Sequence, residues 1–279
     1  MDISIDFLKQ MALNVYEKVH PLIGTEEGAE RAGSERGAGG DMSMHIDIVA
    51  EKAIIEILER SNLDLLLISE EIGEKYIGNK ENAIKNQYKL IVDPIDGSNN
   101  AARGIPFSSV SIAFAVGNKI ANIEKAVIID LTTRDLYWAE RGQGAFLNDN
   151  KISVSDQDKH ELIFEIDYRL RDLEKSLDKY KRIIKKSHRI RTMGSCALSL
   201  CLVARGSIDA YINFKELIRL VDAAAGILIV KEAGGNVFNF EGTELENKLS
   251  INTRFAFIAS NAKLGHFIEK ELAKINSIN

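Results

Sequence analysis

The stretch LIVDPIDGSNN, residues 90–100, runs from an apolar segment directly into a turn that holds two aspartates and a proline. Pro94 fixes its own φ angle and stiffens the turn. Asp93, Asp96 and the backbone carbonyl of Ile95 can therefore face one centre at the end of a buried strand. A surface turn could use the same residue types, so the rest of the chain has to decide between the two interpretations.

The turn continues with Gly97 and Ser98, which can open a helix or turn whose free N–H groups hold a phosphate. This combination indicates phosphoryl chemistry. Phosphatases that form an aspartyl-phosphate also follow a buried strand with two aspartates, but theirs are two positions apart. The spacing of three between Asp93 and Asp96 fits shared metal ligation better than covalent catalysis.

Other apolar runs of the chain also carry carboxylates at their ends, at Asp47, Glu70, Glu71 and Asp222. An ionised carboxylate that loses its water is costly unless it is paired or binds a cation. If these groups converge with the aspartates of the turn, a metal cluster explains them. Oxygen ligands without nearby histidine or thiol favour Mg²⁺ over zinc. The alternative is that each acid caps a helix or ends a strand by itself.

The composition is that of an ordinary globular protein, with 45% hydrophobic and 28% charged residues in a chain of 279. The formal charge of −5 argues against nucleic acid as the main partner. The N-terminus lacks signal-peptide features, and no apolar segment approaches the roughly 18–20 residues that span a bilayer. We therefore expect a cytoplasmic protein without a membrane partner, in which Cys196 and Cys201 are reduced core thiols.

Apolar periodicity divides the chain into helices and strands. Helices are predicted over residues 3–20 and 46–58, strands over 63–71, 88–93, 110–117, 122–130 and 134–140, and a mobile loop over 24–41. Beyond Ile152, predicted helices cover 170–187, a segment from Ser195, 221–235 and 262–275, and predicted strands cover 209–213, 236–239 and 255–260. This pattern predicts an α/β (α+β) fold with an N-terminal half of residues 1–150 and a C-terminal half of residues 151–279.

Four motifs in this order resemble the inositol monophosphatase superfamily of Mg²⁺-dependent, Li⁺-sensitive phosphatases. They are SEE (69–71), DPIDGS (93–98), GS (194–195) and VDAAAGILIVKEAGG (221–235). DPIDGS together with the distant D-x-x-A-G-x-x-x-x-x-E-A-G-G is the most specific part of the match. The resemblance implies a layered α-β-α-β-α sandwich, generally a homodimer.

By position, the resemblance implies metal ligands at Glu70, Asp93, the backbone oxygen of Ile95, Asp96 and Asp222. It implies two or three Mg²⁺ ions, with Mn²⁺ as an alternative. Gly97 and Ser98 match the phosphate-binding turn, and Asp47 matches an acid that pairs with the Ser98 hydroxyl. Glu70 and this pair would orient a water molecule and accept its proton. Asp41, at the end of the predicted loop, would help to bind a third ion.

On the substrate side the resemblance implies Asp96, Gly97, Ser98, Arg191, Cys196 through its backbone, and Lys215. Two departures, together with the segment NAARGIPFSSVSIAF (100–114) after DPIDGS, resemble the archaeal branch, which hydrolyses both fructose 1,6-bisphosphate and inositol 1-phosphate. Val221 replaces a frequent tryptophan, and Lys215 replaces an acid that grips inositol hydroxyls in the animal enzymes. A cation at 215 suits the second phosphate of a bisphosphate. The alternative is a solvated surface lysine.

The resemblance therefore predicts a metal-dependent phosphatase of small phosphorylated sugars or polyols, an enzyme of carbohydrate metabolism. Two alternatives stay open. One is a phosphatase for 3'-phosphoadenosine 5'-phosphate or NADP from the same superfamily. The other is a non-catalytic relative that binds metal or a partner protein.

Overall fold

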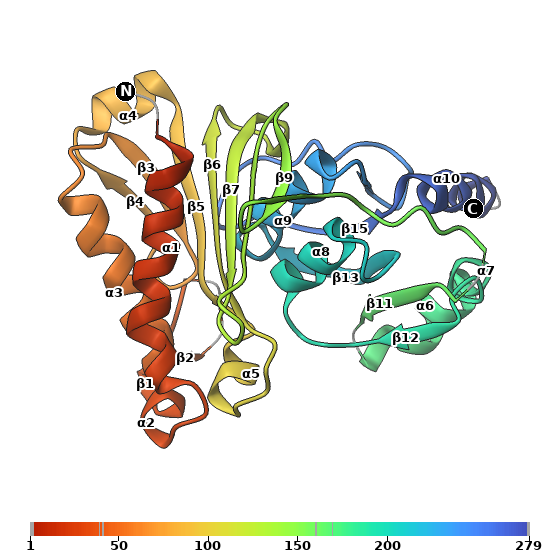
Figure 1. The fold of residues 1–279 in the computed structure, drawn as a ribbon, viewed down its shortest axis with the longest axis horizontal. Helices are drawn as coiled ribbons and strands as arrows, with labels where there is room; N and C mark the ends of the chain where they lie inside the picture. The colour runs from red at the N-terminus through yellow and green to blue at the C-terminus, as the bar shows by residue number, and fades with distance from the viewer. Residues whose placement is uncertain (1–2, 39, 41, 160, 169, 278–279) are drawn as a thin grey trace.

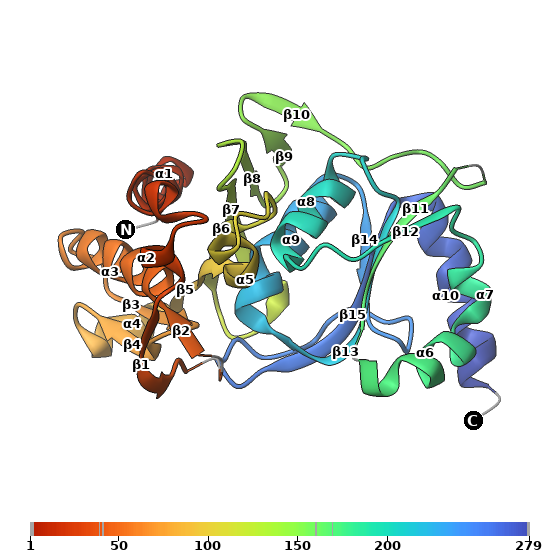
Figure 2. The ribbon, with the colours of Figure 1, turned by 90° about the horizontal axis from the view of Figure 1, so that it is seen from below.

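The computed structural model describes residues 3–38, 40, 42–159, 161–168 and 170–277, and only the backbone of residues 32–36, 172 and 215–216. Layers of helix, sheet, helix, sheet and helix follow one another along the long axis of the molecule (Figure 1). Figure 2 shows the central helices between the two sheets. The predicted α-β-α-β-α sandwich is confirmed.

The first sheet has eight strands in the order β10-β9-β8-β7-β6-β5-β3-β4. They are β3 (Leu65–Ser69), β4 (Gly73–Ile77), β5 (Tyr88–Asp96), β6 (Ser109–Val116), β7 (Ile123–Asp130), β8 (Leu136–Glu140), β9 (Gly144–Leu147) and β10 (Asn150–Ile152). Only β3 and β5 run parallel among these neighbours. The outer face is covered by α1 (Ile5–Val19) and α3 (His45–Glu59), whose apolar stripes pack on it as their periodicity predicts.

The second sheet has five strands in the order β12-β11-β13-β15-β14. They are β11 (Ile163–Asp167), β12 (Arg189–Arg191), β13 (Ala210–Arg219), β14 (Asn236–Phe238) and β15 (Arg254–Ser260). Between the sheets lie α8 (Cys196–Ala204) and α9 (Leu220–Glu232), which are apolar on all sides because both faces are covered. The outer layer holds η3 (Leu170–Asp172), α6 (Leu173–Lys179), α7 (Lys181–Ile184) and α10 (Ala262–Asn276).

Both cysteines lie in α8, where they are buried and free, as the sequence predicts. The boundary expected at residues 150 and 151 falls inside β10, which still belongs to the first sheet. The division into residues 1–150 and 151–279 stays a proposal. None of the described helices is long and apolar enough to cross a membrane.

Two local predictions are wrong, and several elements were not predicted. The described part of 24–41 is not simply a loop, because it contains α2 (Glu26–Ala29) and β1 (Arg31–Arg36), which pairs with β2 (Met42–Met44). The sequence analysis missed α4 (Lys80–Asn86), the short helices η1 (His20–Leu22) and η2 (Ile120–Asn122), and the strands β2, β4, β9, β10, β11 and β12. The helix predicted over 170–187 is interrupted at Tyr180, whose ring packs against those of Phe214 and Phe240.

The structure over 24–41 depends on contacts with a distant turn. Ala38 N donates a hydrogen bond to the carbonyl of Glu71 over 3.0 Å, and the hydroxyl of Ser43 donates to the Glu71 carboxylate. These partners lie about thirty positions further along the chain, so local composition could not reveal them.

Candidate metal and phosphate site

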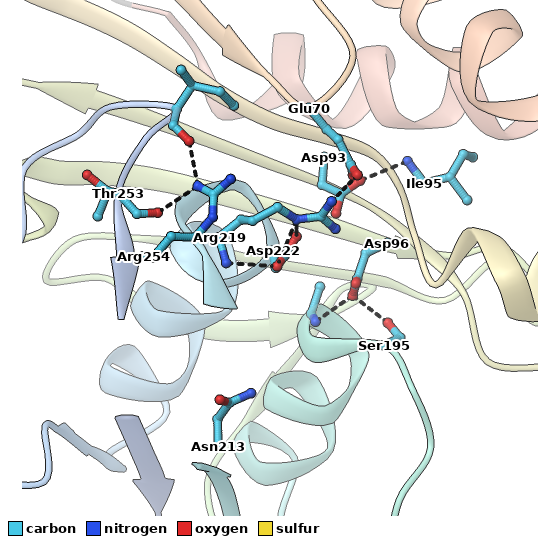
Figure 3. A network of polar contacts seen from close by, with 12 residues as sticks. Glu70, Asp93, Ile95, Asp96, Ser195, Asn213, Arg219, Asp222, Thr253 and Arg254 are labelled. Carbon is cyan, nitrogen blue, oxygen red and sulfur yellow. Dashed lines mark hydrogen bonds and ion pairs between the residues drawn. The ribbon is translucent and has the colours of Figure 1, made fainter. Parts of the chain in front are cut away.

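Three carboxylates meet where the first sheet faces the start of α9 (Figure 3). One oxygen each of Glu70, Asp93 and Asp222 lies within 4.8 Å of the others, and all three residues are buried. Glu70 follows β3, Asp93 lies in the parallel strand β5, and Asp222 lies in the first turn of α9. The parallel strands deliver their carboxyl ends to one edge, and the helix brings the third acid to the same place.

Asp93 is the most deeply buried of the three and has an oxygen without a donor. Its Oδ1 accepts a hydrogen bond from Ile95 N over 3.1 Å. Its Oδ2 accepts none from any N–H or hydroxyl group in the described part of the chain. Buried carboxylate oxygens are normally satisfied, and an all-oxygen donor set suits a hard divalent cation. These residues therefore fit a metal such as Mg²⁺.

Asp96 joins the two halves of the molecule. Its Oδ2 accepts hydrogen bonds from Ser195 Oγ over 2.5 Å and from Ala197 N over 2.6 Å, at the beginning of α8. The group of three mutually close oxygens described above does not include Asp96. Because α8 engages Oδ2, the other oxygen of this carboxylate is the one that would reach a metal.

The phosphate-binding turn predicted at Gly97 is the start of the short helix α5 (Ser98–Ala102). Gly97 has a φ of 87°, and a Cβ there would lie 3.0 Å from the carbonyl oxygen of Phe107. A side chain here would be strained on both counts, which favours glycine. Asn100 Nδ2 donates to the carbonyls of Phe107 and Met193, each over 2.8 Å. The turn is thereby fixed to the segment that precedes α8.

Arg219 enters the carboxylate cluster, and the sequence analysis missed it. This residue ends β13 and precedes α9. Its Nη1 donates to Glu70 Oε1, and its Nε donates to Asp222 Oδ1 over 2.9 Å (Figure 3). The available signal was a basic residue three positions before a predicted ligand at a helix start, where helix geometry brings the two side chains together.

The motifs and the whole-chain comparison agree on the family. Residues 5–276 match the model of the inositol monophosphatase family. The chain belongs to this family. Its membership confirms the resemblance seen in the sequence and the expectation of a phosphatase, and the family implies dependence on a divalent metal.

Two curated relatives and one solved structure illustrate this family. The chain is 38% identical to a fructose-1,6-bisphosphatase/inositol-1-monophosphatase of Methanothermobacter thermautotrophicus, over 90% of this chain and 89% of that relative. It is 37% identical to a bifunctional NADP phosphatase/NAD kinase of Methanococcus maripaludis, over 91% of this chain but 47% of that protein. A crystal structure of an inositol monophosphatase-fructose 1,6-bisphosphatase aligns with a TM-score of 0.81 and 27% identity, over 96% of this chain and 98% of that one.

Asp47 has a structural role in this family member. It lies in the first turn of α3, where Oδ2 accepts a hydrogen bond from Met44 N over 2.8 Å. This is the helix cap that the sequence left open as the alternative for each acid. The pairing of Asp47 with the Ser98 hydroxyl stays a prediction.

The residues predicted on the substrate side lie on two elements of the second half. Arg191 ends β12 and is exposed, with Nη1 donating to the carbonyl of Ile190 over 3.1 Å. Cys196 is the first residue of α8, beside the two groups that donate to Asp96. The side chain of Lys215 and the whole of Asp41 lie outside the described parts of the chain.

Burial dominates the electrostatics of the cluster. It raises the pKa of Glu70 to about 8, although the Arg219 guanidinium pulls that pKa down. Burial and the neighbouring Asp222 raise the pKa of Asp96 to about 7. Burial, with Glu70 as the next cause, raises the pKa of Asp93 well above its ordinary value. A bound cation would stabilise this site strongly, because it offsets the cost of burying several ionised carboxylates next to one another.

Glu51 supports the turn that carries Glu70. It lies on α3, is buried, and its Oε2 accepts a hydrogen bond from Ile72 N over 3.1 Å. Burial raises the pKa of Glu51 from 4.5 to about 7. The folded protein therefore holds this proton at pH values where the unfolded chain has lost it.

The raised pKa of Glu51 gives a testable dependence of stability on pH. Because the folded pKa exceeds the unfolded one, its contribution to stability is complete below about pH 4.5 and is lost as the pH rises through about 7. We expect Glu51→Gln to reduce the stability difference between pH 5 and pH 8 by up to about 3 kcal/mol, at about 1.4 kcal/mol per pKa unit. Denaturant unfolding in EDTA at the two pH values measures this, and an unchanged difference would contradict it.

Proposed function

We propose that this chain is a Mg²⁺-dependent phosphomonoester hydrolase of small phosphorylated sugars or polyols, above all fructose 1,6-bisphosphate and inositol 1-phosphate. The observation that carries the proposal is the meeting of Glu70, Asp93 and Asp222, with one buried Asp93 oxygen lacking a donor, beside the turn at Gly97. The relative from Methanothermobacter thermautotrophicus, named for both substrates and aligned over most of both chains, supports this choice.

The carboxylates divide into two overlapping sets of ligands. Glu70, Asp93 and the Ile95 carbonyl would hold one cation, and Asp93, Asp96 and Asp222 would hold a second. The bound cations supply positive charge that stabilises phosphoryl transfer and lowers the pKa of a bound water. Ile95 N donates to Asp93 Oδ1 and so directs the remaining oxygen of this shared ligand away from the backbone.

The chain's own groups then position water and substrate. Glu70, placed at the edge of the cluster, would accept the proton of the attacking water, with Ser98 and Asp47 orienting that water. The backbone of Gly97 and Ser98 would bind the phosphate at the start of α5. Catalysis would consist of positioning and charge neutralisation without a covalent intermediate.

Several finer features stay predictions. They are the substrate-side roles of Arg191, Cys196 and Lys215, the part of Asp41 in a third metal site, the Li⁺ sensitivity, the homodimer and the cytoplasmic location. A place in carbohydrate metabolism would follow from fructose 1,6-bisphosphate as the substrate.

A second candidate is the hydrolysis of the 2'-phosphate of NADP. The similarity to the bifunctional NADP phosphatase/NAD kinase covers 91% of this chain at 37% identity, nearly the value for the first relative. This chain spans about half of that protein, and NADP hydrolysis is therefore proposed only as the second candidate.

Phosphate release from a panel of substrates tests both candidates. We expect release from fructose 1,6-bisphosphate and inositol 1-phosphate with Mg²⁺, its loss in EDTA and its inhibition by Li⁺. A clear preference for NADP or 3'-phosphoadenosine 5'-phosphate would favour the second candidate. The absence of release from all four substrates with Mg²⁺ or Mn²⁺ would overturn the enzymatic proposal.

A further inference from the structure

Arg219 places a permanent positive charge between two of the three converging carboxylates (Figure 3). Its guanidinium bonds to Glu70 through Nη1 and to Asp222 through Nε, and the side chain is 18% exposed. A guanidinium stays protonated in proteins, because its pKa is above about 12. Arg219 therefore keeps its positive charge at any pH at which the protein is folded, and holds it beside these carboxylates in the metal-free site.

The two carboxylates that Arg219 bridges belong to different metal positions in the proposed function. Glu70 would serve one cation and Asp222 the other. A single side chain therefore occupies ligand oxygens of both positions. This inference rests on the proposed metal-dependent function. It concerns Arg219, which is not one of the proposed metal ligands.

Arg219 brings one positive charge to a site of four carboxyl groups. These belong to Glu70, Asp93, Asp96 and Asp222, and the guanidinium bonds to Glu70 and Asp222. A divalent cation supplies more charge, but next to the guanidinium it meets like-charge repulsion. The favourable entry of a metal thus requires the guanidinium to move off its two carboxylates.

The side chain can leave while its backbone stays in place. Arg219 N donates to Asp222 Oδ2 over 3.0 Å, which caps α9 independently of the guanidinium. The partial exposure of the long side chain offers it a path to water. The helix start that presents Asp222 therefore persists when the guanidinium moves.

We propose that Arg219 is a built-in competitor of the divalent metal. It stabilises the metal-free site by pairing with Glu70 and Asp222, and metal binding displaces it. Because it touches a ligand of each metal position, its displacement by the first cation makes the second easier to bind, so that the two binding steps are positively coupled.

Mn²⁺ binding, followed by the EPR signal of free Mn²⁺, tests this without measuring activity. We expect Arg219→Gln to bind Mn²⁺ at least about tenfold more tightly than the wild type, because no charged hydrogen bond has to break. The sigmoidal isotherm expected for the wild type should become hyperbolic. Arg219→Lys keeps the positive charge but lacks the planar guanidinium that reaches two carboxylates. Its Mn²⁺ affinity should therefore lie between those of the wild type and Arg219→Gln.

Arg254→Gln is the matched control. Arg254 lies opposite Arg219 in the strand register, but its Nη1 donates to the carbonyls of Ile251 and Thr253, over 2.6 and 3.0 Å. Arg254→Gln also removes one positive charge, from the residue that pairs with Arg219 in the neighbouring strand. The Mn²⁺ affinity of this control should stay within about twofold of the wild type. An equal gain in both variants would show a general effect of charge and overturn the competition.

Thermal unfolding in EDTA supplies a second readout. Arg219→Gln should melt below the wild type without metal, and saturating Mn²⁺ should bring the two melting temperatures together. Equal or weaker Mn²⁺ binding by Arg219→Gln would overturn this inference while leaving the metal site intact. If Arg219→Gln fails to fold, Arg219→Lys decides by the same comparison. A wild type that binds no Mn²⁺ would instead overturn the proposed function.

Discussion

Asp93→Asn should lower Mg²⁺-dependent phosphate release by about a thousandfold or more. Asp93 lies at the centre of the cluster, fully buried, and is the residue shared by both proposed metal positions. The charge stabilisation by a bound metal is worth several kcal/mol, and each factor of ten in rate corresponds to about 1.4 kcal/mol. Steady-state phosphate release with saturating Mg²⁺ and fructose 1,6-bisphosphate measures the loss.

The same substitution should stabilise the metal-free protein. An amide carries no charge, so the repulsion by Glu70 and the cost of burying a negative charge disappear, while the amide oxygen of the new side chain can still accept from Ile95 N. We expect the melting temperature in EDTA to rise by several degrees, since about 1 kcal/mol moves it by roughly 2–4 °C in domains of about 150–250 residues. A loss of activity accompanied by a lower melting temperature would point to misfolding instead.

Asp96→Asn should lower phosphate release by at least about a hundredfold and leave the fold intact. The amide oxygen can take the place of Oδ2 and accept from Ser195 Oγ and Ala197 N, so the link to α8 survives. What is lost is the negative charge that would help to hold the second cation. Near-normal turnover by this variant would contradict the two-metal arrangement.

Asp96→Ala is the control that separates the two roles of this carboxylate. It removes the acceptor as well as the charge, and leaves the Ser195 hydroxyl and the Ala197 N–H without their partner at the start of α8. An unsatisfied buried donor costs about 1–3 kcal/mol. The alanine variant should therefore unfold at lower denaturant concentration than the asparagine variant, while both are inactive. Equal stability of the two would show that the link to α8 contributes little.

The local sequence predicted most of the elements because their signals are short-ranged. Helices α1, α3 and α10 and strands β5 to β8 follow from apolar spacing within a few residues. The elements missed or misjudged lack that signal. The hairpin of β1 and β2 contacts Glu71, and the break at Tyr180 coincides with ring contacts to Phe214 of β13 and to Phe240 in the turn after β14.

The carboxylates of the site were identifiable from sequence, but their partners were not. The motifs located Glu70, Asp93 and Asp222, and the structure brings their oxygens together. The hydrogen bonds of Asp96 to α8 and of Arg219 to Glu70 join residues about 100 and 149 positions apart. No pattern within a single segment encodes such pairs.

Apolar periodicity and turn stereochemistry predicted most helices and strands, because these signals act between neighbours along the chain. The layered fold and the acids that could bind a metal were implied by the resemblance of four motifs to a known family. Three roles required the folded molecule: Asp96 anchors α8, Asp47 caps α3, and Arg219 stands between Glu70 and Asp222. The role of Arg219 comes from the packing of α9 against the first sheet, which brings the junction of β13 and α9, and with it this guanidinium, beside Glu70.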